Sequence, residues 1–102
     1  MTYKITLNPN AQNVINLAGS EGISYAGYDG FVIFKESRES PDVLIRFIPG
    51  AGLTLDISGA TLTVDAETAQ ELFDANAAYY CLEVESAAEH HSVKIEAPVE
   101  FV

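Results

Sequence analysis

The sequence is poor in the residues that small functional sites most often need. Its 102 residues include one cysteine, two histidines and no tryptophan. A single thiol excludes an internal disulfide or thiolate metal cluster, and Cys81, in an apolar segment, behaves as a small hydrophobe. No segment approaches the roughly 20 apolar residues of a membrane span, and the first residues lack a signal peptide's apolar stretch. We expect one domain, residues 1–102, made in a cytoplasm and without membrane contact.

Basic residues are also scarce, and they are unevenly distributed. Five Lys and Arg stand against fifteen Asp and Glu, for a formal net charge of −10. From position 47 onward, Lys94 is the only base. Such a surface repels phosphate backbones, so a nucleic-acid partner is not expected. Two interpretations of the charge remain open: solubility at high local concentration, which we favour, and docking onto a basic partner.

Short segments with alternating or continuous apolar character predict a chain made mainly of strands. Glycine, proline and asparagine turns separate these segments and leave room for only one helix. Seven or eight short strands with a single helix are typical of an all-β antiparallel β-sandwich. The expected strands are Tyr3–Leu7, Asn13–Ala18, Phe31–Phe34, Asp42–Ile48, Leu53–Ile57, Ala60–Val64, Ala78–Ser86 and Ser92–Val102.

The order of these strands predicts three hairpins, each made of two successive segments from Phe31 onward. Asp65 suits an N-cap, so the short helix is expected over about 65–73, with an apolar stripe at Ala69, Leu72 and Phe73. Pro98 lacks an N–H and predicts a sheet edge or a bulge in the last strand. The final hairpin is expected to point these side chains into the core: Tyr80, Leu82, Val84, Val93, Ile95 and Phe101.

Few residue patterns suggest chemistry. The run Glu89–His91 invites a metal hypothesis, but adjacent histidines in an extended chain point to opposite sides, so a solvated turn is favoured. Glu83 and Glu85 share one strand face, where solvent exposure leaves them without the burial that shifts a catalytic pKa. The glycine-containing loops match neither a nucleophile elbow nor a phosphate-binding loop. We expect no enzyme activity, catalytic residue, cofactor, metal or small-molecule substrate.

Four tyrosines could instead form a recognition surface. Tyr25 and Tyr28 lie in a glycine-rich loop, and Tyr79 is expected on the strand face opposite Tyr80. Core packing or subunit contact is favoured over ligand stacking for these rings. With Arg38 of the polar turn Ser37–Pro41, the candidate partner-binding residues are Tyr25, Tyr28, Arg38 and Tyr79.

Residues 28–102 resemble a family of small bacteriophage and prophage tail proteins, similar to the N-terminal domain of upper baseplate proteins. The segments that carry the resemblance are Gly30–Lys35, Leu53–Val64, Asp65–Ala69, Tyr79–Val84 and Val99–Val102. The chain departs from that pattern at Ala87–His91 and at Ala97 and Pro98, where the family carries glycine. The resemblance implies an immunoglobulin-like β-sandwich and a role in virion architecture, and it transfers no catalytic residue.

Two functions from different classes follow. The first is a virion structural protein, an adaptor or decoration module of the tail, baseplate or fibre-attachment region. It would present edge strands and the Ser20–Asp29 and Ser37–Pro41 segments to other virion proteins and to copies of itself in a symmetric assembly. The second is a receptor- or carbohydrate-binding β-sandwich module that uses its tyrosines. The expected localisation is the virion.

Overall fold

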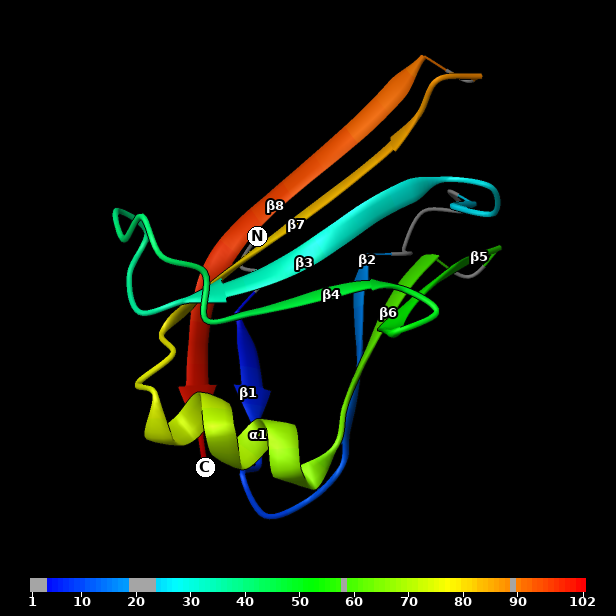
Figure 1. Ribbon diagram of the computed structural model, residues 1–102. Coiled ribbons are helices and arrows are strands. Elements are labelled where there is room, and N and C mark those ends of the chain that lie inside the picture. Colours follow the sequence, from blue (N-terminus) through cyan, green and yellow to red (C-terminus); the bar gives the residue numbers. More distant parts are fainter. Residues whose placement is uncertain (1–3, 19–23, 58, 89) are drawn as a thin grey trace.

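The computed structural model describes residues 4–18, 24–57, 59–88 and 90–102 (Figure 1). Strands account for most of this part of the chain, so the predicted all-β class is confirmed. The elements are β1 (Ile5–Leu7), β2 (Asn13–Ala18), β3 (Asp29–Lys35), β4 (Ile45–Pro49), β5 (Gly52–Asp56), β6 (Gly59–Val64), α1 (Ala66–Asp74), β7 (Tyr79–Ser86) and β8 (His91–Phe101).

All eight strands belong to one sheet in the order β1-β8-β7-β3-β4-β5-β6-β2. The sheet curls until it is nearly barrel-shaped, with β8, β7 and β3 in one arm and β5, β6 and β2 in the other (Figure 1). Helix α1 lies across the end of the sheet where β1 and β8 finish. The three predicted hairpins are confirmed as the antiparallel pairs β3–β4, β5–β6 and β7–β8.

The expectation that every pairing is antiparallel is wrong, because β1 pairs with β8 and β4 pairs with β5 in parallel. The immunoglobulin-like sandwich is not confirmed. A tight corner explains the second parallel pair. Gly50 and Gly52 have φ of +84° and +97°, values that favour glycine, and the Ala51 N–H donates to the Ile48 carbonyl. The chain therefore makes a complete turn and leaves in its original direction, which carries the sheet from one arm to the other.

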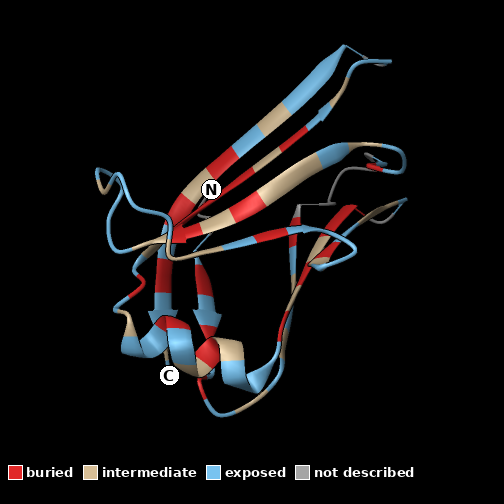
Figure 2. Ribbon diagram, in the orientation of Figure 1, coloured by how far each residue is buried: buried red, intermediate tan, exposed pale blue. Residues whose placement is uncertain are grey.

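The core lies inside the curl and against α1, while the far end of the β7–β8 hairpin is exposed (Figure 2). Tyr80, Leu82, Val84 and Ile95 are buried as predicted, whereas Val93 and Phe101 are only partly buried. The largest fully buried side chains are Tyr80, Phe34, Leu7, Leu53, Leu62, Leu72, Leu82, Val32, Val64 and Val84.

Helix α1 begins where the sequence predicts. The Asp65 carboxylate accepts a hydrogen bond of 2.8 Å from the Thr68 N–H, which satisfies one of the free donors of the first turn. That hydrogen bond also lowers the pKa of Asp65. Ala69 and Leu72 are buried, but Phe73 is 47% exposed and packs only edge-on against Phe101, with ring centroids 5.4 Å apart. The predicted apolar stripe is therefore narrower than expected.

Pro98 lies in a strand that pairs on both sides near its end. The Val99 N–H donates to the Ala78 carbonyl on the β7 side, so the ring nitrogen of Pro98, one residue earlier, faces away from β7. The described pairing with β1 begins only at Val99. Pro98 therefore interrupts no described ladder, although the prediction of an edge strand is wrong for Val99–Phe101.

Candidate functional site

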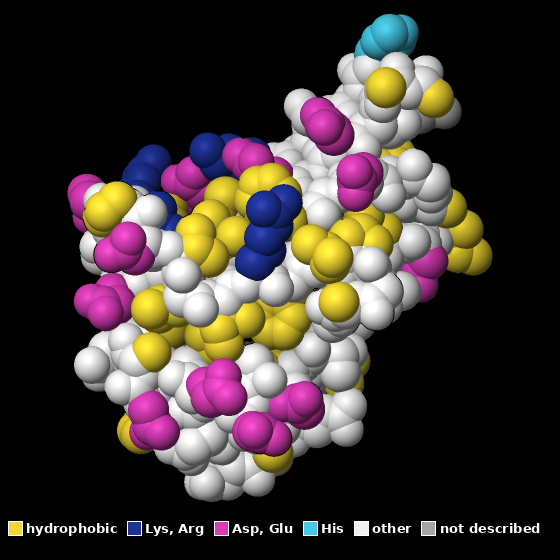
Figure 3. Space-filling model, viewed as in Figure 1, with side chains coloured by type: hydrophobic (Ala, Val, Ile, Leu, Met, Phe, Trp, Pro, Cys, Tyr) yellow, Lys and Arg dark blue, Asp and Glu magenta, His cyan; other side chains and the backbone are white. Residues whose placement is uncertain are grey.

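The outer surface of β4, β3, β7 and β8 differs from the rest of this acidic protein. Together with the turn after β3 it carries four of the five Lys and Arg side chains of the sequence. Figure 3 shows Lys and Arg gathered over these strands beside hydrophobic side chains. We call this surface the mixed-charge face; it consists of Phe31, Ile33, Lys35, Arg38, Arg46, Ile48, Tyr79, Cys81, Glu83, Lys94 and Glu96.

Alternation along the strands builds this face. Val32 and Phe34 are fully buried, so their neighbours Phe31, Ile33 and Lys35 project from the opposite side of β3. The register then sets their neighbours: Ile33 lies between Arg46 of β4 and Cys81 of β7. The same register places Phe31 of β3 beside Glu83 of β7, and Glu83 beside Lys94 of β8. An aromatic ring, an acid and a base therefore lie in one row across three strands.

An arginine and an aromatic ring form the centre of one half of the face. The Arg46 guanidinium lies 4.7 Å from the centroid of the Phe31 ring, within the range of a cation–π contact. Ile48, on the same side of β4, is 46% exposed. These three side chains line a groove of about 710 Å³ whose far wall includes Glu83 and Lys94. Among the ion pairs of the described residues, none involves Arg46, so its charge remains available to an incoming carboxylate.

A charged network around Glu96 forms the other half. The Tyr79 hydroxyl donates to the Glu96 carboxylate at 2.5 Å, and Arg38 lies 3.3 Å from the same oxygen. Lys94 contacts the second oxygen at 2.9 Å and also reaches Glu83 at 3.5 Å. Glu96 therefore links β7, β8 and the turn after β3 through opposite-charge contacts across strands.

The network shifts the ionisation of its members in the directions its contacts predict. The hydrogen bonds from Tyr79 and Lys94 lower the pKa of Glu96. The same carboxylate raises the pKa of Lys94 through its hydrogen bond and its charge. Partial burial, followed by the hydrogen bond to Glu96, raises the pKa of Tyr79 to about 12. At neutral pH Tyr79 is therefore a neutral donor to a charged acceptor, the stronger kind of hydrogen bond.

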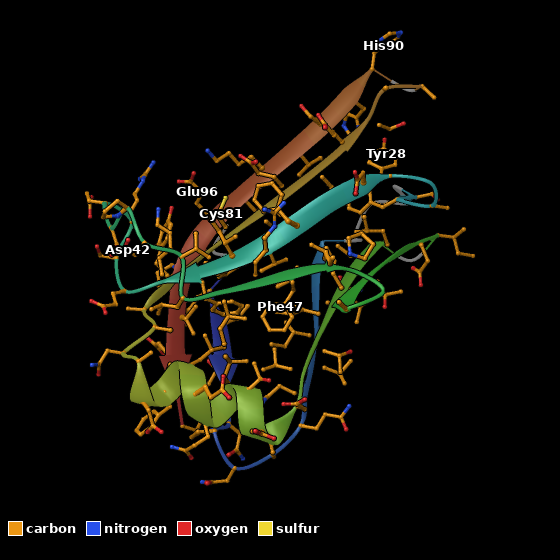
Figure 4. The ribbon with its side chains drawn as sticks, viewed as in Figure 1. Tyr28, Asp42, Phe47, Cys81, His90 and Glu96 are labelled. Atoms are coloured by element: carbon orange, nitrogen blue, oxygen red, sulfur yellow. The ribbon has the colours of Figure 1, made fainter. Side chains whose placement is uncertain are left out.

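Cys81 lies under this network and is buried (Figure 4). Desolvation, with the nearby charges of Glu83 and Glu96, raises the pKa of its thiol. Because the thiolate is the nucleophilic form, this environment keeps the sulfur unreactive. The prediction that Cys81 acts as a small hydrophobe is confirmed in its burial.

The four residues predicted to bind a partner do not form one site. Arg38 and Tyr79 meet at Glu96 within the mixed-charge face. Tyr28, labelled in Figure 4, lies at the other end of the molecule, where its hydroxyl is 2.8 Å from Nδ1 of His91. Tyr25 is 3% exposed and belongs to the core, in agreement with the core packing favoured over ligand stacking for these rings.

The burial of Tyr25 has a local cause. Its N–H donates to the Asp56 carbonyl at 2.8 Å, and its ring packs at 5.1 Å from that of Tyr28. The chain before β3 is thus tied to the end of β5, and the ring is turned inward. Residues 20–23 of the predicted Ser20–Asp29 contact segment lie outside the described residues.

The metal hypothesis gains no support from the geometry. Glu89 lies outside the described residues, His90 occupies a turn with φ of +50°, and His91 contacts Tyr28. Within the described ranges, no group of three or more His, Cys, Asp or Glu side chains is placed to hold a metal ion. Likewise, none of the helices in the described ranges has the length and apolar character needed to cross a membrane.

Sequence reasoning missed the central residues of this face: Phe31, Arg46 and Lys94. Alternation could have found them, because each directly precedes a buried residue of its own strand. It could not show that the three strands are neighbours.

The chain matches no protein-family model, no curated protein and no solved structure. The resemblance to phage tail proteins therefore stays a prediction.

Proposed function

We propose that this protein is a bacteriophage virion structural protein, an adaptor or decoration module of the tail, baseplate or fibre-attachment region that acts by protein–protein assembly. The resemblance in the sequence supports the phage role, and the mixed-charge face supports the mode of action. The kinship also implies an immunoglobulin-like sandwich, for which the two facing arms of the curved sheet would serve as layers. The proposal includes no catalysis and no cofactor.

The observation that carries the proposal is the groove formed around Arg46 and Phe31. Arginine and aromatic side chains are enriched at the energetic centres of protein interfaces, surrounded by polar groups. Here an arginine that forms no ion pair with any described carboxylate stacks on a half-buried ring beside the exposed Ile48, and charged residues border it. A partner that offers a carboxylate next to an apolar side chain fits this arrangement.

The first experiment asks whether the protein is part of the particle. Phage particles are purified from cells that carry the gene, and their proteins are identified by mass spectrometry. The protein should be present at a fixed copy number and should sediment with the particles. Its absence from intact particles would end the proposal.

The second experiment tests the face itself. Arg46→Glu should reduce incorporation into particles roughly tenfold or more, because a carboxylate at the centre of the groove repels the incoming one. Lys4→Glu is a matched control, since it changes the net charge equally while Lys4 lies outside the mixed-charge face and pairs with the exposed Glu100, 3.3 Å away. Equal incorporation of both variants would contradict a role for this face.

Receptor or carbohydrate binding is the alternative, and one observation favours it. Tyr28 and His91 stack edge-on with centroids 5.9 Å apart at an exposed end of the molecule. Tyr28→Ala should then abolish adsorption to cells or glycans while leaving the fold intact. Unchanged adsorption by this variant would eliminate the alternative, whereas its loss would favour it over assembly.

A further inference from the structure

The strand β2 lies at one end of the sheet order, and among the described strands it pairs only with β6. It has six residues, against three in β1 at the other end. A strand at a sheet edge presents a row of backbone N–H and C=O groups that can pair with another strand. Natural edges are usually protected by lysine, proline or inward-pointing charges, and β2 contains none of these. Within the described part of the chain, β2 does carry one protective feature, a bulge between Asn16 and Ala18.

This edge is uncharged in a protein of net charge −10. No charged residue occurs between Lys4 and Glu21, and the adjacent strand β6 has none either. Val14 is 66% exposed and Asn16 is exposed beside it, next to Thr61 and Thr63 on β6. Where the surface carries carboxylates, the approach of a second copy brings like charges together, which costs free energy that grows as they are desolvated. At the β2 edge two copies meet without that repulsion.

The start of β2 is held in place before any partner arrives. The Asn13 side chain donates to the Asn8 carbonyl at 3.0 Å and to the Ala11 carbonyl at 2.9 Å, and it accepts from the Asn8 N–H at 2.9 Å. On the inner side of the strand Leu17 is buried and Ile15 packs against the core. A strand fixed in this way loses little conformational entropy when it pairs, which favours association.

We propose that β2 pairs antiparallel with β2 of a second copy of this chain, across a two-fold axis near Ile15, so that the two sheets become continuous. Val14 of one copy then lies opposite Asn16 of the other, a pair without charge. Because a two-fold contact uses the same edge of both copies, the pairing closes at a dimer. The inference rests on the proposed assembly role and names its copy-to-copy contact, which leaves the mixed-charge face available to other virion proteins.

Sedimentation of the purified protein over a range of concentrations tests this contact without any phage particle. The wild-type protein should pass from monomer to dimer as its concentration rises. Val14→Lys and Asn16→Lys should each raise the dimer dissociation constant at least about tenfold, because each places cations against the edge of the other copy. Val43→Lys is the matched control: Val43 is 48% exposed between β3 and β4, and its variant should dimerise normally. Circular dichroism confirms that each variant is folded.

Salt supplies a second, independent readout. Since no ion pair contributes to a β2–β2 contact and both chains are negative, raising NaCl from about 0.05 to 0.5 M should strengthen dimerisation by screening repulsion. Association through the mixed-charge face would instead weaken with salt and disappear in Arg46→Glu. Three results would overturn the inference. They are association that weakens with salt and disappears in Arg46→Glu, a monomer at every concentration, and a dimer unaffected by both edge variants. Because particle incorporation is measured separately, failure here is distinguishable from failure of the proposed function.

Discussion

The substitution Gly30→Ala in β3 adds one methyl group. Intrinsic propensity predicts that this group raises stability, whereas the structure predicts that it lowers stability. A Cβ at this position would lie 2.3 Å from the Glu83 carbonyl oxygen and 2.7 Å from Cγ1 of Val84. Both atoms belong to β7, which pairs with β3 along its whole length. The chain can relieve these contacts only by separating the two central strands under the mixed-charge face.

The magnitude of the Gly30→Ala effect follows from two opposing contributions. Replacing glycine within a strand normally stabilises a protein by about 0.5–1 kcal/mol, because the unfolded chain loses freedom. Overpacking a well-packed region costs about 1–3 kcal/mol, and a contact with rigid backbone belongs at the upper end. We expect a net loss of about 2 kcal/mol, which lowers Tm by about 8–16 °C in a domain of this size.

Thermal and urea unfolding, followed by circular dichroism and tyrosine fluorescence, measure this change. Amide shifts in NMR spectra should also move at Glu83 and Val84, far from position 30 in the sequence. Gly27→Ala is the control, since a Cβ at Gly27 meets no atom within 4 Å and its backbone strain at φ of +82° is local. A Gly30→Ala protein with unchanged or higher Tm would falsify the β3–β7 register.

Three further changes probe the core, the charged network and the helix cap. Phe34→Ala removes a fully buried ring 6.2 Å from that of Tyr80 and should cost about 3–5 kcal/mol in urea unfolding; a loss below about 1 kcal/mol would contradict this core. The fold raises the pKa of Tyr79 to about 12, above the value of about 10 in the unfolded chain. The contribution of Tyr79 to folding stability is therefore complete below about pH 10 and is lost as pH rises through the folded pKa. Tyr79→Phe should therefore remove a tyrosinate step near pH 12 in absorbance at 295 nm, and Glu96→Gln should shift that step to lower pH; an unchanged titration would refute the 2.5 Å hydrogen bond. Asp65→Ala should lower the urea midpoint of unfolding, because the Thr68 N–H loses its acceptor, and Asn at this position should restore most of the loss. Because the pKa of Asp65 is lowered in the fold, its contribution is present above the unfolded pKa and disappears as pH falls through the folded one, so the Ala variant should show less acid destabilisation.

Sequence alone identified the elements that depend on nearby residues. The β5–β6 hairpin follows from two alternating segments around a short glycine turn, and α1 follows from Asp65 before an apolar period of three to four. In both cases the deciding residues lie within about one helical turn or one tight loop of each other. Alternation likewise assigned Tyr80 to the core and Tyr79 to the outer surface, which the observed burial confirms.

The tertiary structure alone decided how the three hairpins and the strands β1 and β2 join into one sheet, and the candidate site depends on that arrangement. Alternation tells which face of a strand a side chain occupies, but it contains no information about the strand beside it. Arg38 meets Glu96 because β3 pairs with β7 and β7 with β8, and Tyr25 is buried because its backbone is bonded to Asp56. Pairings between distant segments are selected by the total apolar surface that the closed sheet buries, a property of the whole chain. For this reason the sequence determined hairpins, helix and core faces, whereas the single curved sheet and its mixed-charge face arose only when those parts were packed together.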